Sequence, residues 1–245
     1  MDDGPISICI EDLAKRLRTT EALRGVTARI VPGRLHGLIG PDGAGKTTLL
    51  RLLVGLLRPD AGRITFHEGD TPVAFDTVRP HMAYMPQQQS LYPDLSVAEH
   101  LEFFRELYQI PAAVYAERAQ RLLRLARLEE FRERPARQLS GGMYKKLGLM
   151  CALLQSPRVV LLDEPTNGVD PISRREFWEL LYDLVAQGIL VLVTTAYMDE
   201  AERCGMVHVL DSGTLIGEGE PRAVLEQARA GSFEELFLRN AGEHA

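Results

Sequence analysis

LIGPDGAGKTTLLR, residues 38–51, is the stretch that decides the fold of this chain. Within it, Gly40, Gly45, Lys46 and Thr47 have the spacing G-x-x-x-x-G-K-[ST] of a phosphate-binding loop. The preceding GRLHGLIG is short and mostly apolar, as in a buried strand, and the following TTLLRLLVGLL has the 3.6-residue period of a helix. Strand, loop and helix occur in the order that such a site requires, which favours phosphate binding over an ordinary Gly-rich turn.

The glycines of this loop explain how it would bind an anion. Gly40, Gly43 and Gly45 allow the backbone to curl so that successive N–H groups point inward. The N-terminus of the following helix adds its partial positive charge. The loop is therefore a candidate phosphate site on physical grounds as well as by its spacing.

Composition indicates a globular protein without the overall charge expected for binding nucleic acid through its phosphates, although a local basic patch is the alternative. The chain has 245 residues with 45% hydrophobic content, enough for one large domain or a domain with a lobe. A net charge of −6 gives no electrostatic basis for binding nucleic acid. The acidic start MDDG is unlike a secretory signal, and no apolar run approaches the roughly 18 residues of a membrane-spanning helix. We therefore expect a cytosolic chain that does not cross a bilayer.

The three cysteines indicate neither a disulfide framework nor a zinc site. Cys9, Cys151 and Cys204 lie far apart and have no paired ligand spacing. We expect all three to be reduced and buried.

Periodicity outlines the remaining elements. We expect strands near residues 6–10, 23–30 and 63–66, and a last pair of strands around a turn at 211–213. Residues 69–80 lack a clear period and should form a loop with a short helical piece. Ser96 and Glu99 form a capping box that opens the amphipathic helix VAEHLEFFRELYQI, and a second helix, AAVYAERAQRLLRLARL, follows Pro111. Together these helices predict an α-helical lobe.

The segment RVVLLDEP carries a second strong signal. Its four apolar residues, 159–162, predict a buried parallel strand that ends at Asp163 and Glu164. Open α/β sheets bind their ligands at the carboxyl ends of their strands. The two acids are therefore candidate site residues, although two acids closing a strand in solvent is the alternative.

Two other segments are weak signals when taken alone. Pro86 places Gln87, Gln88 and Gln89 on a loop, where glutamines are usually solvated. In ARQLSGGM, Ser140 can cap a helix and two glycines expose N–H groups, but a plain helix cap is the favoured interpretation.

The order of these motifs resembles a known family. GPDGAGKTT (40–48), YMPQ (84–87), LSGGM (139–143), VVLLDEP (159–165) and NGVDP (167–171) together resemble the nucleotide-binding cassette of ABC transporters, over nearly the whole chain. LYPDLSVAEHL, LSGGMYKKLGL and TTAYMDEAE are most similar to ATPase subunits of drug, antibiotic or polysaccharide exporters. More narrowly, the chain lacks a histidine after ILVLVTT, and in this it resembles the first cassette of tandem-cassette multidrug exporter ATPases.

The resemblance implies a fold. It is an α/β fold with a P-loop NTPase core of mainly parallel sheet, an antiparallel β part and an inserted α-helical subdomain. We expect the core with its antiparallel part at 1–95 and 157–220, the helical signature subdomain at 96–156, and a C-terminal helical tail at 221–245.

The resemblance also implies how the loop would bind Mg-ATP. Lys46 would hold the β- and γ-phosphates and Thr47 would ligate Mg²⁺. Thr48 and the loop amides would hold the remaining oxygens. The loop residues concerned are Gly40, Pro41, Asp42, Gly43, Ala44, Gly45, Lys46, Thr47 and Thr48.

Three further side chains would serve hydrolysis. Asp163 would reach Mg²⁺ through its water shell, and Glu164 would polarise the attacking water as general base. Gln87 would contact the metal or the water and report nucleotide occupancy to a membrane partner.

The signature residues would act on another cassette. Ser140, Gly141 and Gly142 would close over the γ-phosphate of nucleotide bound to the partner cassette of a dimer, with Asp170 at the shared interface.

Two positions depart from the family pattern. A histidine that touches the γ-phosphate should follow ILVLVTT, but Ala196 stands there and its methyl group cannot donate a hydrogen bond. An aromatic residue that stacks on adenine is expected before the phosphate loop, but only Leu17 is present, between Arg16 and Arg18. We expect weaker base stacking, unless an arginine plane substitutes, and slow hydrolysis at this chain's own site.

The function implied is that of the ATP-binding subunit of an ABC exporter. Its partners would be an integral-membrane permease, docked near residues 87–94, and a second cassette that is identical, different or fused; nucleic acid would not be a partner. It would lie at the inner face of the cell membrane. The alternatives are a soluble ABC ATPase, which usually has two cassettes in one chain, zinc insertions or basic surfaces, and a regulatory cassette without significant turnover.

Overall fold

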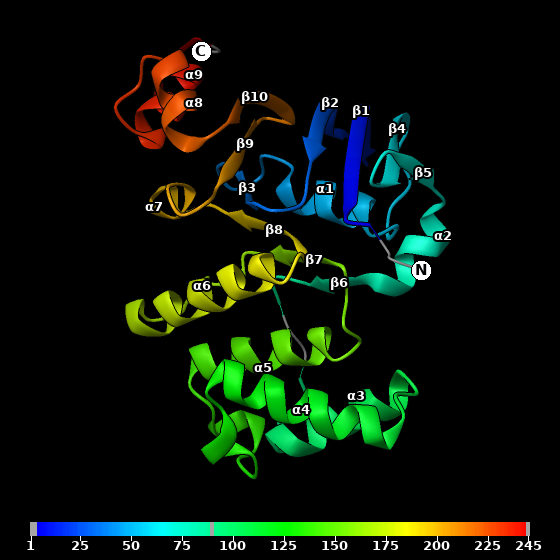
Figure 1. Ribbon diagram of the computed structural model, residues 1–245. Coiled ribbons are helices and arrows are strands. Elements are labelled where there is room, and N and C mark those ends of the chain that lie inside the picture. Colours follow the sequence, from blue (N-terminus) through cyan, green and yellow to red (C-terminus); the bar gives the residue numbers. More distant parts are fainter. Residues whose placement is uncertain (1–3, 89–90, 244–245) are drawn as a thin grey trace.

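Two β-sheets of different kinds organise the chain, and the computed structural model describes residues 4–88 and 91–243 (Figure 1). The first sheet is antiparallel throughout, with the strand order β2-β1-β4-β5. Its strands are β1 (Ile6–Leu17), β2 (Thr20–Ile30), β4 (Ala61–Glu68) and β5 (Thr71–Val73).

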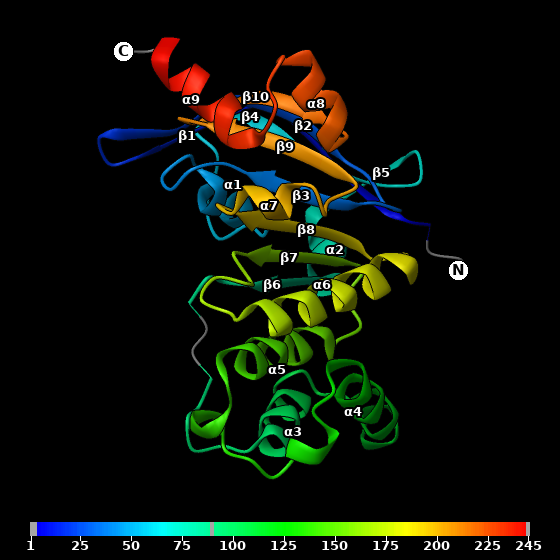
Figure 2. The ribbon, with the colours of Figure 1, turned by 90° about the vertical axis from the view of Figure 1, so that its left-hand side faces the viewer.

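The second sheet has the order β10-β9-β3-β8-β7-β6, and all of its pairings except β10 with β9 are parallel. Figure 2 shows these strands one below another in that order. They are β3 (Leu35–Ile39), β6 (Met82–Met85), β7 (Val159–Asp163), β8 (Leu190–Thr195), β9 (Met206–Asp211) and β10 (Thr214–Gly219). The predicted mainly parallel sheet with a separate antiparallel part is therefore confirmed.

The central strands are buried on both faces, which explains their uninterrupted apolar sequences. In β7, Val159 and Leu161 pack into a core with the antiparallel sheet, whereas Val160 and Leu162 pack into a core with the helices on the other side. Alternate side chains of a strand point to opposite faces, so a strand between two cores must be apolar at every position.

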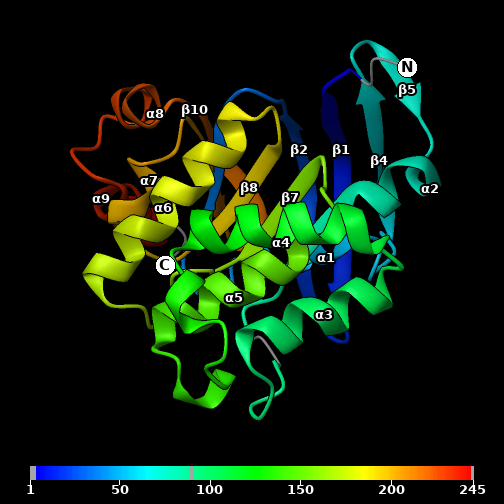
Figure 3. The ribbon, with the colours of Figure 1, turned by 60° about the horizontal axis from the view of Figure 1, so that its bottom comes forward.

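Helices cover both faces of the parallel sheet. Helix α1 belongs to the core shared with the antiparallel sheet, and helices α5 and α6 pack on the opposite face (Figure 3). The α-helices are α1 (Lys46–Leu53), α2 (Phe75–Val78), α3 (Val97–Leu107), α4 (Ala112–Ala126), α5 (Gly141–Leu153), α6 (Pro171–Ala186), α7 (Met198–Ala201), α8 (Pro221–Gln227) and α9 (Phe233–Glu243). Short 3₁₀ turns are η1 (Arg79–His81), η2 (Glu129–Phe131) and η3 (Ala136–Gln138).

The helical lobe forms as its caps predict. The Ser96 side chain accepts from the Glu99 N–H while the Glu99 carboxylate accepts from the Ser96 N–H, so the predicted capping box is present at the start of α3. Pro111 precedes α4, and Ser140 caps α5 by accepting from the Met143 N–H. Figure 1 places α3, α4 and α5 together at the end of the molecule opposite α8 and α9.

Several element bounds differ from expectation for physical reasons. Strand β1 continues past residue 10 to Leu17 because irregularities beyond Ile10 let it remain paired with β2. Helix α1 stops at Leu53, and Gly55 then takes a positive φ of 73°. The predicted loop at 69–80 contains β5, a three-residue edge strand too short to show a period.

The cysteines agree only in part with the prediction. Cys151 and Cys204 are buried, and burial raises the pKa of each thiol to about 12. Cys9 is only partly buried, since it lies on β1, which is exposed in part. Within residues 4–88 and 91–243, no helix is both long enough and apolar enough to pass through a bilayer.

Candidate active site

The residues predicted to bind phosphate and to serve hydrolysis meet where β3, β7 and β8 end, whereas the predicted signature residues do not. A cleft of about 530 Å³ opens there, between the β1–β2 hairpin, the phosphate loop and the residues after β7. It is within the size range of small-molecule sites. The residues that line it are Leu17, Thr20, Ala22, Asp42, Gly43, Gly45, Lys46, Thr47, Thr48, Gln87 and Glu164.

The phosphate loop needs glycine for two different reasons. Gly43 and Gly45 have φ of 80° and 109°, in the region that side chains other than glycine rarely adopt. Gly40 has no room for a side chain, because a Cβ there would lie 2.1 Å from the carbonyl oxygen of Leu210. The loop therefore depends on the strand β9 behind it as well as on its own conformation.

Lys46 is the buried cation at the centre of the cleft. Its side chain is 5% exposed, and its ammonium donates to the carbonyl oxygens of Gly40 (2.7 Å) and Pro41 (3.1 Å). It also lies 3.4 Å from Oε1 of Glu164. A phosphate entering the loop would compete with that carboxylate for the lysine.

Asp163 accepts hydrogen bonds from hydroxyl groups of one helix, α1, and two strands, β8 and β6. Its Oδ1 accepts from Thr47 (3.1 Å) and from Thr194 (2.8 Å), and its Oδ2 accepts from the Tyr84 hydroxyl (3.4 Å). Burial, followed by the nearby charge of Asp163, raises the pKa of Tyr84. Thr194 and Tyr84 were not predicted; two successive threonines at the end of an apolar strand were the signal available for the first.

Glu164 faces the cleft from a strained backbone. Its φ is 46°, and its N–H donates to Thr194 Oγ1 (2.9 Å). A non-glycine residue in this region costs about 1–2 kcal/mol, which the surrounding contacts offset. The Oε2 atom accepts from Gln87 Nε2 (2.7 Å) and from Asn167 Nδ2 (3.3 Å).

Lys145 connects the helical lobe to this site and was missed from the sequence. It lies on α5, and its ammonium donates to the carbonyl oxygen of Gln87 (2.9 Å). Burial lowers the pKa of Lys145, opposed by the charges of Glu164 and Asp163. Of the three predicted loop glutamines, Gln87 reaches the site, whereas Gln89 lies outside the described residues.

The signature residues lie apart from the cleft. Ser140 and Gly141 are exposed at the start of α5 and do not line it. Gly142 is buried, and a Cβ there would lie 2.3 Å from Cβ of Ser173 on α6. Asp170 caps α6, accepting from the N–H groups of Ile172 and Ser173, and these hydrogen bonds, that of Ser173 first, lower its pKa.

The β1–β2 hairpin places an aliphatic side chain in the cleft, where the adenine base of a nucleotide could pack against it. Leu17 is 38% exposed and lines the cleft together with Thr20 and Ala22. Arg16 instead pairs with Glu21 (2.7 Å) and is not among the cleft-lining residues. Arg18 does not line the cleft either.

The oxygen donors in the cleft suit a hard cation that takes only part of its ligands from the protein. Thr47 and Asp163 are in contact and Gln87 lies close to Glu164, so oxygen ligands converge here. In the part of the chain that the structure describes, no cluster of three or more His, Cys, Asp or Glu residues could hold a metal by itself. This fits Mg²⁺, which usually takes few protein ligands and completes its shell with water and substrate phosphate.

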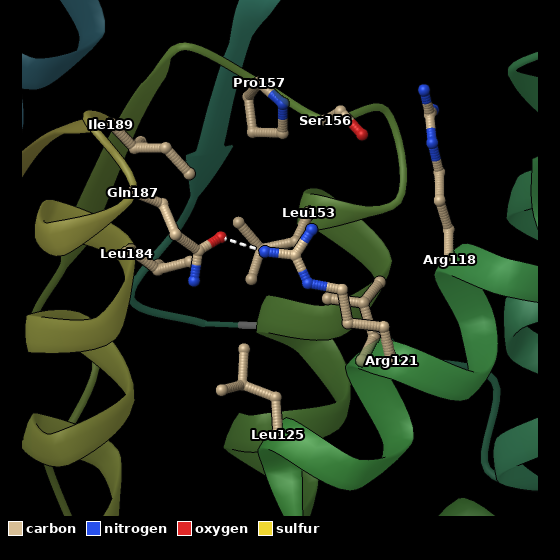
Figure 4. Close-up of a pocket in the computed structure, with 10 residues that line it drawn as sticks. Arg118, Arg121, Leu125, Leu153, Ser156, Pro157, Leu184, Gln187 and Ile189 are labelled. Atoms are coloured by element: carbon tan, nitrogen blue, oxygen red, sulfur yellow. Dashed lines mark hydrogen bonds between the residues drawn. The ribbon is translucent and has the colours of Figure 1, made fainter.

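A second cavity lies between the helical lobe and the core (Figure 4). It measures about 100 Å³, and Arg121 donates across it to Gln187. The lining residues are Arg118, Arg121, Leu122, Leu125, Leu153, Ser156, Pro157, Leu184, Gln187 and Ile189. Its small volume and its distance in the fold from the phosphate loop set it apart from the nucleotide site.

The arrangement of phosphate loop, Asp163 and Glu164 agrees with a comparison to known families. The family model described as ABC transporter matches residues 23–167. The chain belongs to the ABC transporter family. As an ABC cassette it is an ATP-binding ATPase unit, and its fold is the one expected from its motifs.

Relatives of this cassette are found among bacterial export proteins. It is 43% identical over 236 residues to the probable multidrug ABC transporter ATP-binding protein YbhF of Escherichia coli. The aligned part covers 95% of this cassette but only 40% of the length of YbhF. It is 39% identical over 219 residues to the Nod factor export ATP-binding protein I of Ralstonia nicotianae, covering 89% of the cassette and 68% of that protein. A daunorubicin resistance ATP-binding protein of Streptomyces coeruleorubidus is 38% identical over 238 residues, covering 97% and 75%.

Solved structures agree. An ATP-binding subunit of an ABC transporter has a TM-score of 0.80 with 30% identity, covering 95% of this cassette and 98% of that chain. A dimeric bacterial ABC transporter cassette has a TM-score of 0.74 with 24% identity, covering 87% and 98%, and supports the fold alone.

Proposed function

We propose that this cassette is the ATP-binding subunit of an ABC exporter. In this role a pair of cassettes binds and hydrolyses Mg-ATP, and the resulting closure and opening move a separate membrane subunit. The observation that carries the proposal is that Lys46, Thr47 and Glu164 line one cleft, with 3.4 Å between Lys46 Nζ and Glu164 Oε1. Asp163 accepts from the Thr47 hydroxyl at 3.1 Å. The relatives named as export proteins support export as the direction of transport. The proposed location of the cassette is the inner face of the cell membrane.

In the proposed reaction, a water oxygen attacks the γ-phosphorus of ATP and the bond from that phosphorus to the bridging oxygen of ADP breaks. Glu164 takes a proton from the water, so the products are ADP and inorganic phosphate. Lys46 leaves its contact with Glu164 to hold the β- and γ-phosphates. Mg²⁺, bound by Thr47 and reached by Asp163 through water, would neutralise charge developing on the phosphate oxygens.

The position of the signature residues supports a dimer. Ser140 and Gly141 are exposed and do not face the cleft of their own chain, so they are available to another cassette. Lys145, next to them on α5, contacts Gln87, which would couple the signature helix to nucleotide at the γ-phosphate position. A neighbouring apolar groove of about 150 Å³ between β6, α3 and α5 supports docking of a membrane subunit.

We further propose that this cassette's own site hydrolyses ATP slowly because Ala196 cannot donate a hydrogen bond to the γ-phosphate. Losing one such donor in the transition state costs about 10²–10³ in rate. Its signature residues would meanwhile complete the site on the partner cassette. This favours a partner cassette that differs from this one or is fused to it.

The test is nucleotide binding and steady-state ATPase of the purified chain, with Ala196→His as the key variant. We expect wild type to bind Mg-ATP and turn over slowly, and Ala196→His to raise the rate by about 10²–10³. Ala113→His, on the exposed face of α4, is the matched control. A wild-type rate that histidine does not improve would rule out impairment, and co-purification without any integral membrane protein would favour a soluble ABC ATPase.

A further inference from the structure

The residue after Ala196 reaches the candidate base through one intermediary. The Tyr197 hydroxyl donates to Oδ1 of Asn167 (3.2 Å), and Nδ2 of Asn167 donates to Oε2 of Glu164 (3.3 Å). Tyr197 precedes α7 at the end of β8, whereas Asn167 follows β7, so the chain of contacts bridges two strand ends.

Tyr197 is held through its backbone and through one face of its ring. Its backbone N–H donates to Thr195 Oγ1 (3.0 Å), and the Arg174 guanidinium lies over the ring, 4.7 Å from its centre. Arg174 is itself held 3.6 Å from the buried carboxylate of Glu200. A ring packed in this way loses less conformational entropy when its hydroxyl bonds to Asn167 than a free side chain would.

Thr195 cannot take the same role. Its hydroxyl is 2% exposed and donates to Glu200 Oε2 (2.7 Å), so it points into the core rather than toward the cleft. Thr194 also contacts this residue, but through the Glu164 backbone N–H. Tyr197 is the described residue at the end of β8 whose side chain is linked, through Asn167, to the Glu164 carboxylate.

The direction of each hydrogen bond explains what Tyr197 does. An ionised carboxylate only accepts, so Asn167 must turn its NH₂ group, and not its carbonyl oxygen, toward Glu164. A hydroxyl donating to Oδ1 selects that orientation. With Oε2 taken by Asn167 and Gln87, Oε1 becomes the proton-accepting oxygen once Lys46 moves to phosphate.

We propose that Tyr197 is a positioning residue for Glu164, acting through the Asn167 amide. The inference rests on the proposed function, in which Glu164 is the general base. In this proposal, Tyr197 fixes the orientation of the Glu164 carboxylate in a site that lacks the histidine expected at position 196.

The test separates chemistry from binding in the purified full chain. Tyr197→Phe removes one hydrogen bond, so we expect kcat to fall about 3- to 10-fold with KM and the Kd for Mg-ATP unchanged. Tyr182→Phe is the matched control, because its hydroxyl donates to the Arg203 carbonyl oxygen (3.0 Å) and lies outside this chain of contacts. An unchanged kcat in Tyr197→Phe would overturn the proposal.

A double-mutant cycle distinguishes relay from packing. If Tyr197 acts through Asn167, then Asn167→Ala combined with Tyr197→Phe should be no slower than Asn167→Ala alone. Multiplying effects would overturn the relay.

Running the same cycle in the Ala196→His background separates the two proposals. If histidine raises the rate but Tyr197→Phe has no effect in either background, only the relay fails. If Tyr197→Phe slows both backgrounds while histidine does not raise the rate, only the impairment fails. Absence of hydrolysis in both backgrounds would overturn the relay together with the base role of Glu164.

Discussion

The segments that follow β3 and β8 start side by side and are built in opposite ways. The two strands are parallel neighbours, with Ile39 opposite Thr195, and the Gly40 N–H donates to the Thr195 carbonyl oxygen (3.4 Å). After β3 the chain presents glycine amides and a lysine to the cleft. After β8 come Ala196 and Tyr197, which are not among the cleft-lining residues, and this segment is held to the core by the buried carboxylate of Glu200.

Under the proposed function, this difference would separate nucleotide binding from catalysis. The β3 segment contains the groups that would hold phosphates, whereas the β8 segment is linked, through Asn167, to the carboxylate that would activate water. Changes in the first should alter affinity, and changes in the second should alter turnover or folding. The following experiments test this division, from the largest expected effect to the smallest.

Glu164→Gln should abolish most hydrolysis while leaving binding intact. A glutamine keeps the shape but cannot accept the proton, and general base catalysis contributes about 10²–10⁴ in rate. The loss is measured most clearly in the Ala196→His background, with the Kd for Mg-ATP determined in parallel. Glu117→Gln, exposed on α4, is the control; comparable rates in the two variants would remove Glu164 from the mechanism.

Glu200→Ala should destabilise the fold rather than the nucleotide site directly. The carboxylate is 1% exposed and accepts from Thr166 (2.7 Å), Thr195 (2.7 Å) and Trp178 (3.3 Å). Removing it leaves buried donors unpaired, which should lower the free energy of unfolding by about 3 kcal/mol.

Urea denaturation measures that change, with the exposed neighbour Glu202→Ala as control. Equal stability of the two variants would show that the β8 segment is not anchored at Glu200.

Lys46→Ala should weaken Mg-ATP binding by about 10- to 100-fold, the range for losing a hydrogen bond to a charged group. Equilibrium binding is the measurement, and Lys15→Ala, whose ammonium pairs with Asp60 at 2.7 Å on the other sheet, is the control. A lysine variant that binds normally but hydrolyses slowly would break the proposed division between the two segments.

Acidification should lower stability through histidines buried in the sheet that carries both segments. His36 Nδ1 lies 3.0 Å from His208 Nε2; burial lowers the pKa of His36 and lowers that of His208 to about 3. Because the unfolded histidine titrates near pH 6.5, the unfolded state binds more protons below that pH. Stability should therefore fall by about 2 kcal/mol between pH 7 and pH 5.

Glu218, whose pKa burial raises, faces His208 at 3.4 Å and offsets part of this loss, since its folded form takes up protons more readily. Urea denaturation at pH 7, 6 and 5 checks the slope, and Glu218→Gln removes the offset. A rise in stability on acidification would contradict the assignment.

Much of the site could be predicted from sequence because its residues lie in short contiguous motifs. Lys46 and Thr47 follow a Gly-rich loop, and Asp163 and Glu164 end an apolar strand, so local chemistry and chain order were enough. The alternation of β7 between two cores explains why its apolar run was a clear strand signal. The roles of these residues and the boundaries of the helical subdomain stay predictions.

Other parts depended on contacts between distant segments. Lys145 meets Gln87 across 58 positions, and no local pattern marks either as the partner of the other. Gly142 was assigned to phosphate binding, but in this chain its lack of a side chain is also required by packing against Ser173.

The sequence by itself determined that this chain has a phosphate loop, an acidic strand end and an alanine where a donor is expected, because spacing along the backbone is enough to encode them. Only the tertiary structure decided that Tyr197 reaches Glu164 through Asn167. The two hydrogen bonds that link Tyr197 to Glu164 form only when the sheet brings the ends of β7 and β8 together, because a hydrogen bond requires its donor and acceptor to lie about 3 Å apart.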